Sequence, residues 1–178
     1  MKKKVRVTII QNEVITLHSI SLNLLDAGKN EEIGRKFRWL IPCMAFSAFR
    51  IEALCNLFGT QLPLPQKRNF KSMTYIDKVK HISTFLGMKF DINIEPWKTI
   101  EEMKDFRNLL VHAKPEEIFF DAEIPTEMEN KMALYFGNRP KVDNSVSSKY
   151  SEETAERFIK QIDFISGNWS FLCRKHNH

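Results

Sequence analysis

The sequence predicts an all-α protein, a bundle of four or five helices that forms a single domain over residues 1–178. Apolar residues recur at spacings of three and four in five separate segments, which is the period of an amphipathic helix. Hydrophobic residues make up 43% of the chain, including 14 Phe, which is enough for one bulky core. Only 6 Gly and 7 Pro occur, which argues against a disordered chain. Minor short strands fit the pattern only in residues 1–10 and after Pro115.

The first two helices are predicted over residues 13–27 and about 30–58. Gly28 is placed to end the first helix, because glycine adopts the left-handed conformation that often follows a last turn. Asn30 is expected to cap the second helix with its side chain. Pro42 lies inside that second segment and predicts either a kink or a division into two helices.

A third helix is predicted from Ser72, as its N-cap, to residue 86, with Gly87 ending it. Ser151 is expected to cap the last helix, which runs to about residue 172. The stretch before the third helix, residues 62–72, contains two prolines and several basic residues. It is therefore predicted to be an extended, positively charged loop.

The pattern weakens after Pro115. Residues 118–120 and 133–136 fit short strands or irregular packing segments, and part of this region fits one or two helical turns instead. Residues 138–150 are polar in composition and are expected to be a flexible or lid-like stretch.

The fourth helix is predicted over residues 99–115 and is the most informative segment. Thr99 and Glu102 stand in the S/T-x-x-E spacing of a capping box, and Pro115 stops the helix. Its last turns carry four polar residues, which are a fixed cation, an acid, an amide and a titratable imidazole: Arg107, Asp105, Asn108 and His112.

Composition limits the partners and the compartment. A net charge of +5 is compatible with an anionic partner such as nucleic acid. The three cysteines form no C-x-x-C pair, so buried reduced thiols in an intracellular protein are expected, with no metal site and no cofactor. The basic start of the chain lacks the apolar run of a signal peptide, and no stretch of about 18 apolar residues predicts a membrane span. We therefore expect a cytoplasmic protein.

The segment RNLLVH, residues 107–112, is an R-x4-H arrangement with a polar residue directly after the Arg. In this helical context the chain resembles the HEPN superfamily, whose hallmark is R-x4–6-H on a late helix of an α-bundle. The segment FRIEALCN, residues 49–56, is similar to the second helix of those proteins. The resemblance covers the span from the first helix to Pro115.

This resemblance implies a metal-independent endoribonuclease that cleaves single-stranded or loop RNA through attack of the ribose 2′-OH. His112 has the pKa for acid or base chemistry near neutrality. The planar guanidinium of Arg107 suits phosphate oxygens. Asn108 lies one turn before His112, so it can orient the imidazole or bind the substrate. The catalytic residues are thus predicted to be Arg107, His112 and Asn108.

Other polar residues are assigned to RNA binding or to support of the site. The basic residues expected to hold the RNA backbone without reading its sequence are Lys114, Lys67, Arg68 and Lys71. Glu52 and Asn56 lie one turn apart in an apolar helix, so they face either solvent or a polar site. Together with Asp105 they are predicted to support the site, although a surface ion pair is the simpler interpretation of that acid.

The helical spacing predicts a composite site. Five residues correspond to about 500° of rotation, so Arg107 and His112 would lie roughly 140° apart around one helix. HEPN proteins pair two such helices across a twofold axis, which implies a homodimer with a shared cleft. Fraying of the helix end is the alternative way to bring the two residues together.

Three hypotheses follow for function. The first is a ribonuclease acting as a toxin or in phage defence, with a possible antitoxin or other partner protein. The second is a catalytically silent HEPN-like dimer that binds RNA, a nucleotide or a protein. The third is a plain helical scaffold in which His112 only favours the helix dipole. Some toxin members carry a Tyr two residues after the His, whereas this chain has Lys114, which puts any mechanism that needs that Tyr in doubt.

Overall fold

The computed structural model describes residues 13–32, 35–63, 67, 69–112 and 151–176. The described residues form five α-helices and one short 3-10 turn, and they contain no strand, so the all-α prediction is confirmed. The possible strands of residues 1–10 and those after Pro115 lie outside the described residues, as does the stretch 138–150. The helices are α1 (Val14–Lys29), α2 (Phe37–Gly59), α4 (Tyr75–Phe85), α5 (Trp97–Val111) and α8 (Glu152–His176), and the 3-10 turn is η1 (Phe70–Ser72).

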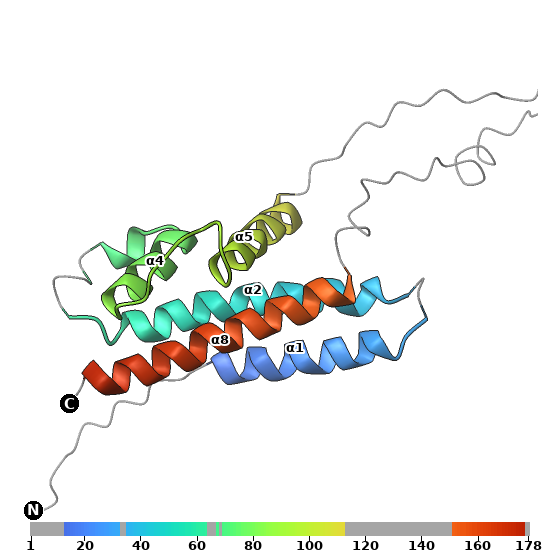
Figure 1. Cartoon of the computed structure of the whole chain (residues 1–178). Helices are drawn as coiled ribbons and strands as arrows, with labels where there is room; N and C mark the ends of the chain where they lie inside the picture. The colour runs from blue at the N-terminus through green and yellow to red at the C-terminus, as the bar shows by residue number, and fades with distance from the viewer. Residues whose placement is uncertain (1–12, 33–34, 64–66, 68, 113–150, 177–178) are drawn as a thin grey trace, which may run out of the picture.

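Helix α2 is the centre of the bundle. It contacts each of the other four helices, with α1 and α8 lying alongside it as long neighbours and α4 and α5 packing on its other side (Figure 1). The central position follows from composition, because α2 is apolar around most of its circumference. By length and composition α2 alone among the described helices could cross a membrane, but half of its most apolar window is buried inside the bundle.

Aromatic side chains join the helices across the core. Trp169 of α8 meets Phe58 of α2 edge to face, with ring centroids 5.3 Å apart. Phe158 of α8 meets Phe106 of α5 in the same way at 6.1 Å. Each of these aromatic residues lies on the apolar side of its helix, as the sequence period predicts. The last helix therefore closes the bundle by packing on both α2 and α5.

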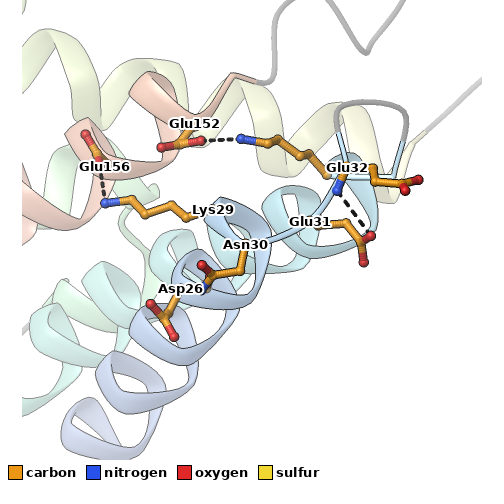
Figure 2. Close-up of polar contacts among 8 residues, drawn as sticks. Asp26, Lys29, Asn30, Glu31, Glu32, Glu152 and Glu156 are labelled. Carbon is orange, nitrogen blue, oxygen red and sulfur yellow. Dashed lines mark hydrogen bonds and ion pairs between the residues drawn. The ribbon is translucent and has the colours of Figure 1, made fainter.

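Ion pairs at the surface tie the last helix to the first two. Lys29 of α1 pairs with Glu156, and Lys36 pairs with Glu152 at 2.8 Å (Figure 2). Both pairs are partly exposed, so each contributes little to stability. These ion pairs hold the start of α8 against the first two helices.

Two predicted helix ends are confirmed, the predicted end at Gly28 is wrong because α1 continues through it to Lys29, and two predicted caps are also wrong. Gly87 follows α4 with φ of +80°, and the Ser151 hydroxyl accepts a hydrogen bond from the Thr154 backbone N–H at 3.1 Å. Asn30 instead ends α1, and its side chain donates to the Asp26 carbonyl at 2.9 Å. Thr74, not Ser72, caps α4. The reason is that Ser72 is taken up by the preceding 3-10 turn.

The predicted capping box at the start of α5 is also wrong. The helix begins two residues earlier, at Trp97, because that side chain is buried and its Nε1–H donates to the Lys89 carbonyl at 3.0 Å. Thr99 therefore lies inside the first turn, fully buried, and its hydroxyl has no hydrogen-bond partner among the described residues. Glu102 binds Arg157 of α8 instead, at 2.7 Å. Tertiary packing has overridden the local capping signal.

The second helix also differs from its predicted start, and its proline does not divide it. It begins at Phe37 rather than near Asn30, and Pro42 lies within the continuous helix. Pro42 is the sixth residue of α2, beyond the first turn, so it leaves the Arg38 carbonyl without its helical N–H donor, and the helix continues through it.

Candidate functional site

The end of α5 presents the predicted catalytic residues. Met103 and Phe106 are buried and anchor this helix in the core. The neighbouring position on the helical surface is Arg107, which therefore lies at the edge of the core beside α2. Its Nη2 is 3.6 Å from Oε2 of Glu52, and both side chains are 37% exposed. The structure thus brings together Arg107 and one of the three predicted supporting residues.

This ion pair is loose. A distance of 3.6 Å exceeds that of a charge-assisted hydrogen bond, which is about 2.7–2.9 Å. Nε of Arg107 is buried and has no hydrogen-bond partner among the described residues. The guanidinium is thus held only loosely by the described residues, and its exposed part is available to an acceptor such as a phosphate oxygen.

Tyr75, the first residue of α4, adds a polar group that the sequence analysis missed. Its hydroxyl is buried and also lacks a partner among the described residues. The pKa of Tyr75 is raised well above its ordinary value, first by burial and then by the nearby Cys55 and Glu52, whereas the charge of Arg107 acts in the opposite direction. Nothing in the sequence distinguishes this Tyr from an ordinary apolar position of an amphipathic helix.

His112 lies just beyond the last turn of α5. The helix ends at Val111, and His112 has φ of −116° and ψ of 28°, with its backbone N–H donating to the Asn108 carbonyl at 2.9 Å. His112 is thus the C-cap residue of α5: its N–H makes the last helical hydrogen bond, and its own dihedral angles are no longer helical. The side chains of Asn108 and His112 are exposed and make no hydrogen bond with any described residue. Both are therefore open to a ligand or to a second protein.

The same helix end exposes three consecutive apolar residues. Leu109, Leu110 and Val111 are 41%, 39% and 62% exposed. Consecutive residues lie about 100° apart around a helix, so these three side chains span roughly 200° of this end. Apolar side chains gathered around a polar site are typical of a surface that another molecule covers.

A basic groove lies at the far end of α2. It has a volume of about 430 Å³ and is lined by residues from the end of α2 and the following loop, with two Lys and no acid among them: Asn56, Gly59, Thr60, Lys67, Phe70 and Lys71. Asn56, a predicted supporting residue, is thus brought together with two predicted RNA-binding residues. Lys78 approaches the Phe70 ring, with Nζ 5.6 Å from the centroid. Arg68 and Lys114 lie outside the described residues.

Asp105 lies elsewhere. It pairs with Lys104 at 3.3 Å and lines a groove of about 390 Å³ between α5 and α8. That groove has an apolar floor of Phe106, Leu109 and Phe158. Positions 105 and 107 differ by about 200° around a helix, which explains why Asp105 is separated from Arg107. Among the described residues, no cluster of three or more potential metal ligands exists.

The chain matches no model of a known protein family, no curated protein and no solved structure in comparisons of its sequence and fold.

Proposed function

We propose that the chain is a metal-independent endoribonuclease that cleaves single-stranded or loop RNA and acts as a homodimer. The observation that carries this proposal is the incompletely paired guanidinium of Arg107 at the same helix end as the exposed imidazole of His112. Arginine offers a permanent charge to phosphate, and histidine exchanges protons near neutral pH. Together they supply the two functions that cleavage by a neighbouring hydroxyl requires.

The reaction follows from these roles. One His112 accepts the proton of the ribose 2′-OH, and the resulting oxygen attacks the adjacent phosphorus. The bond to the 5′-oxygen breaks, and that oxygen takes up a proton from His112 of the partner subunit. The products are a 2′,3′-cyclic phosphate and a free 5′-OH. Arg107 stabilises the additional negative charge on the phosphate oxygens in the transition state.

A second copy of the chain is part of the proposal because one chain offers a single imidazole at this site. The exposed apolar residues at the end of α5 favour such pairing, since they surround the polar residues that a shared cleft would contain. We expect Val111→Glu to shift the protein toward the monomer in sedimentation experiments and to reduce cleavage. If the wild type is a monomer at concentrations at which it cleaves RNA, the composite site is wrong.

The basic groove supports RNA as the substrate. Lys67 and Lys71 hold phosphates through charge, which positions a strand without reading its sequence. Asn56, which lines the groove, lies one helical turn along α2 from Glu52, the partner of Arg107. A strand that follows this line passes the proposed reacting groups.

The test is cleavage of a labelled RNA by wild type and by variants that keep the fold. Arg107→Ala and His112→Ala should each lose about 100-fold or more in activity, as expected for removal of phosphate stabilisation or proton transfer. Arg38→Ala is the matched control, because Arg38 is exposed on α2. Cleavage should survive EDTA and should stop when the scissile ribose is 2′-deoxy. Full activity of His112→Ala would contradict the mechanism.

A catalytically silent dimer that binds RNA, a nucleotide or a partner protein is the alternative. The observation that favours it is the carboxylate of Glu52 beside Arg107, because a carboxylate competes with phosphate for the same guanidinium. Binding of RNA to wild type without cleavage under any condition would select this alternative. Growth arrest on expression that requires His112 would add support for a toxin or defence role, and relief by a co-expressed protein would identify an antitoxin.

A further inference from the structure

Three helices contribute polar side chains that interact electrostatically with one another near Arg107. Glu52 comes from α2, Tyr75 from the first turn of α4 and Arg107 from α5. The hydroxyl of Tyr75 and Nε of Arg107 are both buried. Glu52 is the acid on α2 that pairs with Arg107, and it is also the carboxylate whose charge acts on Tyr75. The cluster therefore contains two buried donors and one acceptor.

The two buried donors are not hydrogen-bonded to the acceptor. Neither Tyr75 Oη nor Arg107 Nε has a hydrogen-bond partner among the described residues, and buried polar groups in folded proteins nearly always have one. An ionised carboxylate accepts several hydrogen bonds through its two oxygens. Glu52 is half-exposed and held only by a 3.6 Å contact, so a change of side-chain rotamer is open to it. A rotamer that brings the carboxylate within reach of both donors would satisfy them.

We propose that Tyr75 is a positioning residue for Arg107. Its hydroxyl donates to the Glu52 carboxylate, and that carboxylate in turn accepts from Nε of Arg107 on the buried side of the guanidinium. The planar group is then fixed with its two terminal nitrogens turned toward the exposed side, where the RNA phosphate binds. This inference rests on the proposed function for its consequence, because the phosphate is the group for which Arg107 is positioned.

The arrangement also resolves the competition between Glu52 and phosphate. A carboxylate that binds the guanidinium through Nη2 blocks one of the two nitrogens that a phosphate would use. Bound through Nε, the same carboxylate holds the guanidinium without blocking the Nη1 and Nη2 pair. Tyr75 favours the second arrangement because it draws the carboxylate inward.

The test separates orientation of Arg107 from RNA cleavage. The Nε–Hε signal of Arg107 in a nitrogen-15 NMR spectrum is assigned by its loss in Arg107→Lys. Tyr75→Phe, which removes only the hydroxyl, should shift this signal and speed its hydrogen exchange by about tenfold, the factor expected for one hydrogen bond to a charged group. Glu52→Gln should produce a similar change, and the double variant should add little to it.

Thr99→Val is the matched control, because it also removes a buried, unpaired hydroxyl. Thr99 lies near the start of α5, at the opposite end of that helix from Arg107. It should leave the Arg107 signal unchanged. In RNA cleavage, Tyr75→Phe should lower kcat by about tenfold with little change in KM, since misplacement of a catalytic group acts on the transition state.

The outcomes distinguish the two proposals. An Arg107 signal that is the same in wild type and Tyr75→Phe overturns the positioning role, whatever the activity. A signal that shifts as expected in a protein that cleaves no RNA supports the positioning role and contradicts the ribonuclease. A loss of kcat in Tyr75→Phe equal to that in Thr99→Val would assign the effect to general packing and also overturn the proposal.

Discussion

Two ion pairs begin two residues apart on α2 and face opposite sides of the helix. Arg50 points toward α1 and α8, where its Nη1 lies 2.7 Å from Oδ1 of Asp163. Glu52 points toward α4 and α5, where it lies 3.6 Å from Arg107. The Arg50 side chain is 7% exposed, whereas that of Arg107 is 37% exposed. One arginine is enclosed by the fold and the other is accessible at its edge.

The difference shows where the chain uses charge for structure and where charge is available for binding. The Arg50 contact is an ion pair without directed hydrogen bonds, since its Nη1 and Nε have no hydrogen-bond partner among the described residues. Its close distance still compensates a charge that would otherwise be buried alone. The Arg107 contact compensates a charge that water already solvates in part. Removing it should therefore cost the fold less than removing the Arg50 pair, and ligand binding is the use we propose for Arg107.

Neutralising the two carboxylates gives the largest contrast. Asp163→Asn should lower the free energy of unfolding by about 2 kcal/mol, less than for a fully buried pair because Asp163 is 47% exposed. Glu52→Gln should lower it by less, about 1 kcal/mol, because residue 52 is 37% exposed and the amide oxygen can still accept a hydrogen bond. Urea unfolding of both variants measures the difference. Equal losses would mean that the two ion pairs do not differ in their structural role.

Gly59→Ala tests whether the basic groove belongs to the rigid part of the fold. A Cβ at residue 59 would lie 2.9 Å or less from three atoms of the Phe70 ring. Overpacking of this kind costs about 1–3 kcal/mol, and the displaced ring would also reshape the groove. The midpoint temperature of thermal unfolding should therefore fall, and the affinity for RNA should weaken. A variant as stable as wild type would indicate that Phe70 moves freely, so the groove would not be preformed.

The charge of the groove is tested by Lys67→Glu combined with Lys71→Glu. RNA affinity should fall about tenfold or more at physiological salt, and the slope of log K against log[salt] should decrease in size by about 1.4, for two lost phosphate contacts on a single strand. Lys160→Glu, an exposed change on α8, is the control and should have a smaller effect. An equal loss for the control would mean that net charge, rather than the groove, determines binding.

The smallest expected effect is a dependence of the free energy of unfolding on pH that arises from His18. Its Nδ1 lies 3.7 Å from Oδ1 of Asp163. The pKa of His18 is lowered from its ordinary value of about 6.5 by burial and then by Arg50, with Asp163 acting against the shift. The unfolded chain therefore binds this proton more readily than the folded chain. The contribution of His18 to the free energy of unfolding should be fully present above pH 6.5 and should be lost as the pH falls below that value.

The control for this dependence is a pair of histidine substitutions. His18→Gln should flatten the decline in unfolding free energy between pH 7 and pH 5, measured by urea titration at several pH values. His112→Gln should leave it in place, because the His112 side chain is exposed at the end of α5. A decline that persists unchanged in His18→Gln would assign it to other groups.

Local signals in the sequence predicted much of the bundle. The apolar period of 3.6 residues predicted all five described helices, since an amphipathic stripe needs no knowledge of its partner to be recognised. Gly87 and Ser151 predicted helix ends correctly because their effect depends on the adjacent backbone alone. Thr99 misled the prediction because burial of Trp97 moved the helix start, which is a decision of the tertiary structure.

The candidate site divides in the same way. The sequence by itself determined that Arg107, Asn108 and His112 would share one helix end and that Lys67 and Lys71 would form a basic loop. Only the tertiary structure decided that Glu52 meets Arg107, that Asn56 joins the two lysines and that the Tyr75 hydroxyl is buried. The physical reason is that a helical period fixes which residues share a face, whereas the packing of α2 against α4 and α5 fixes which faces meet.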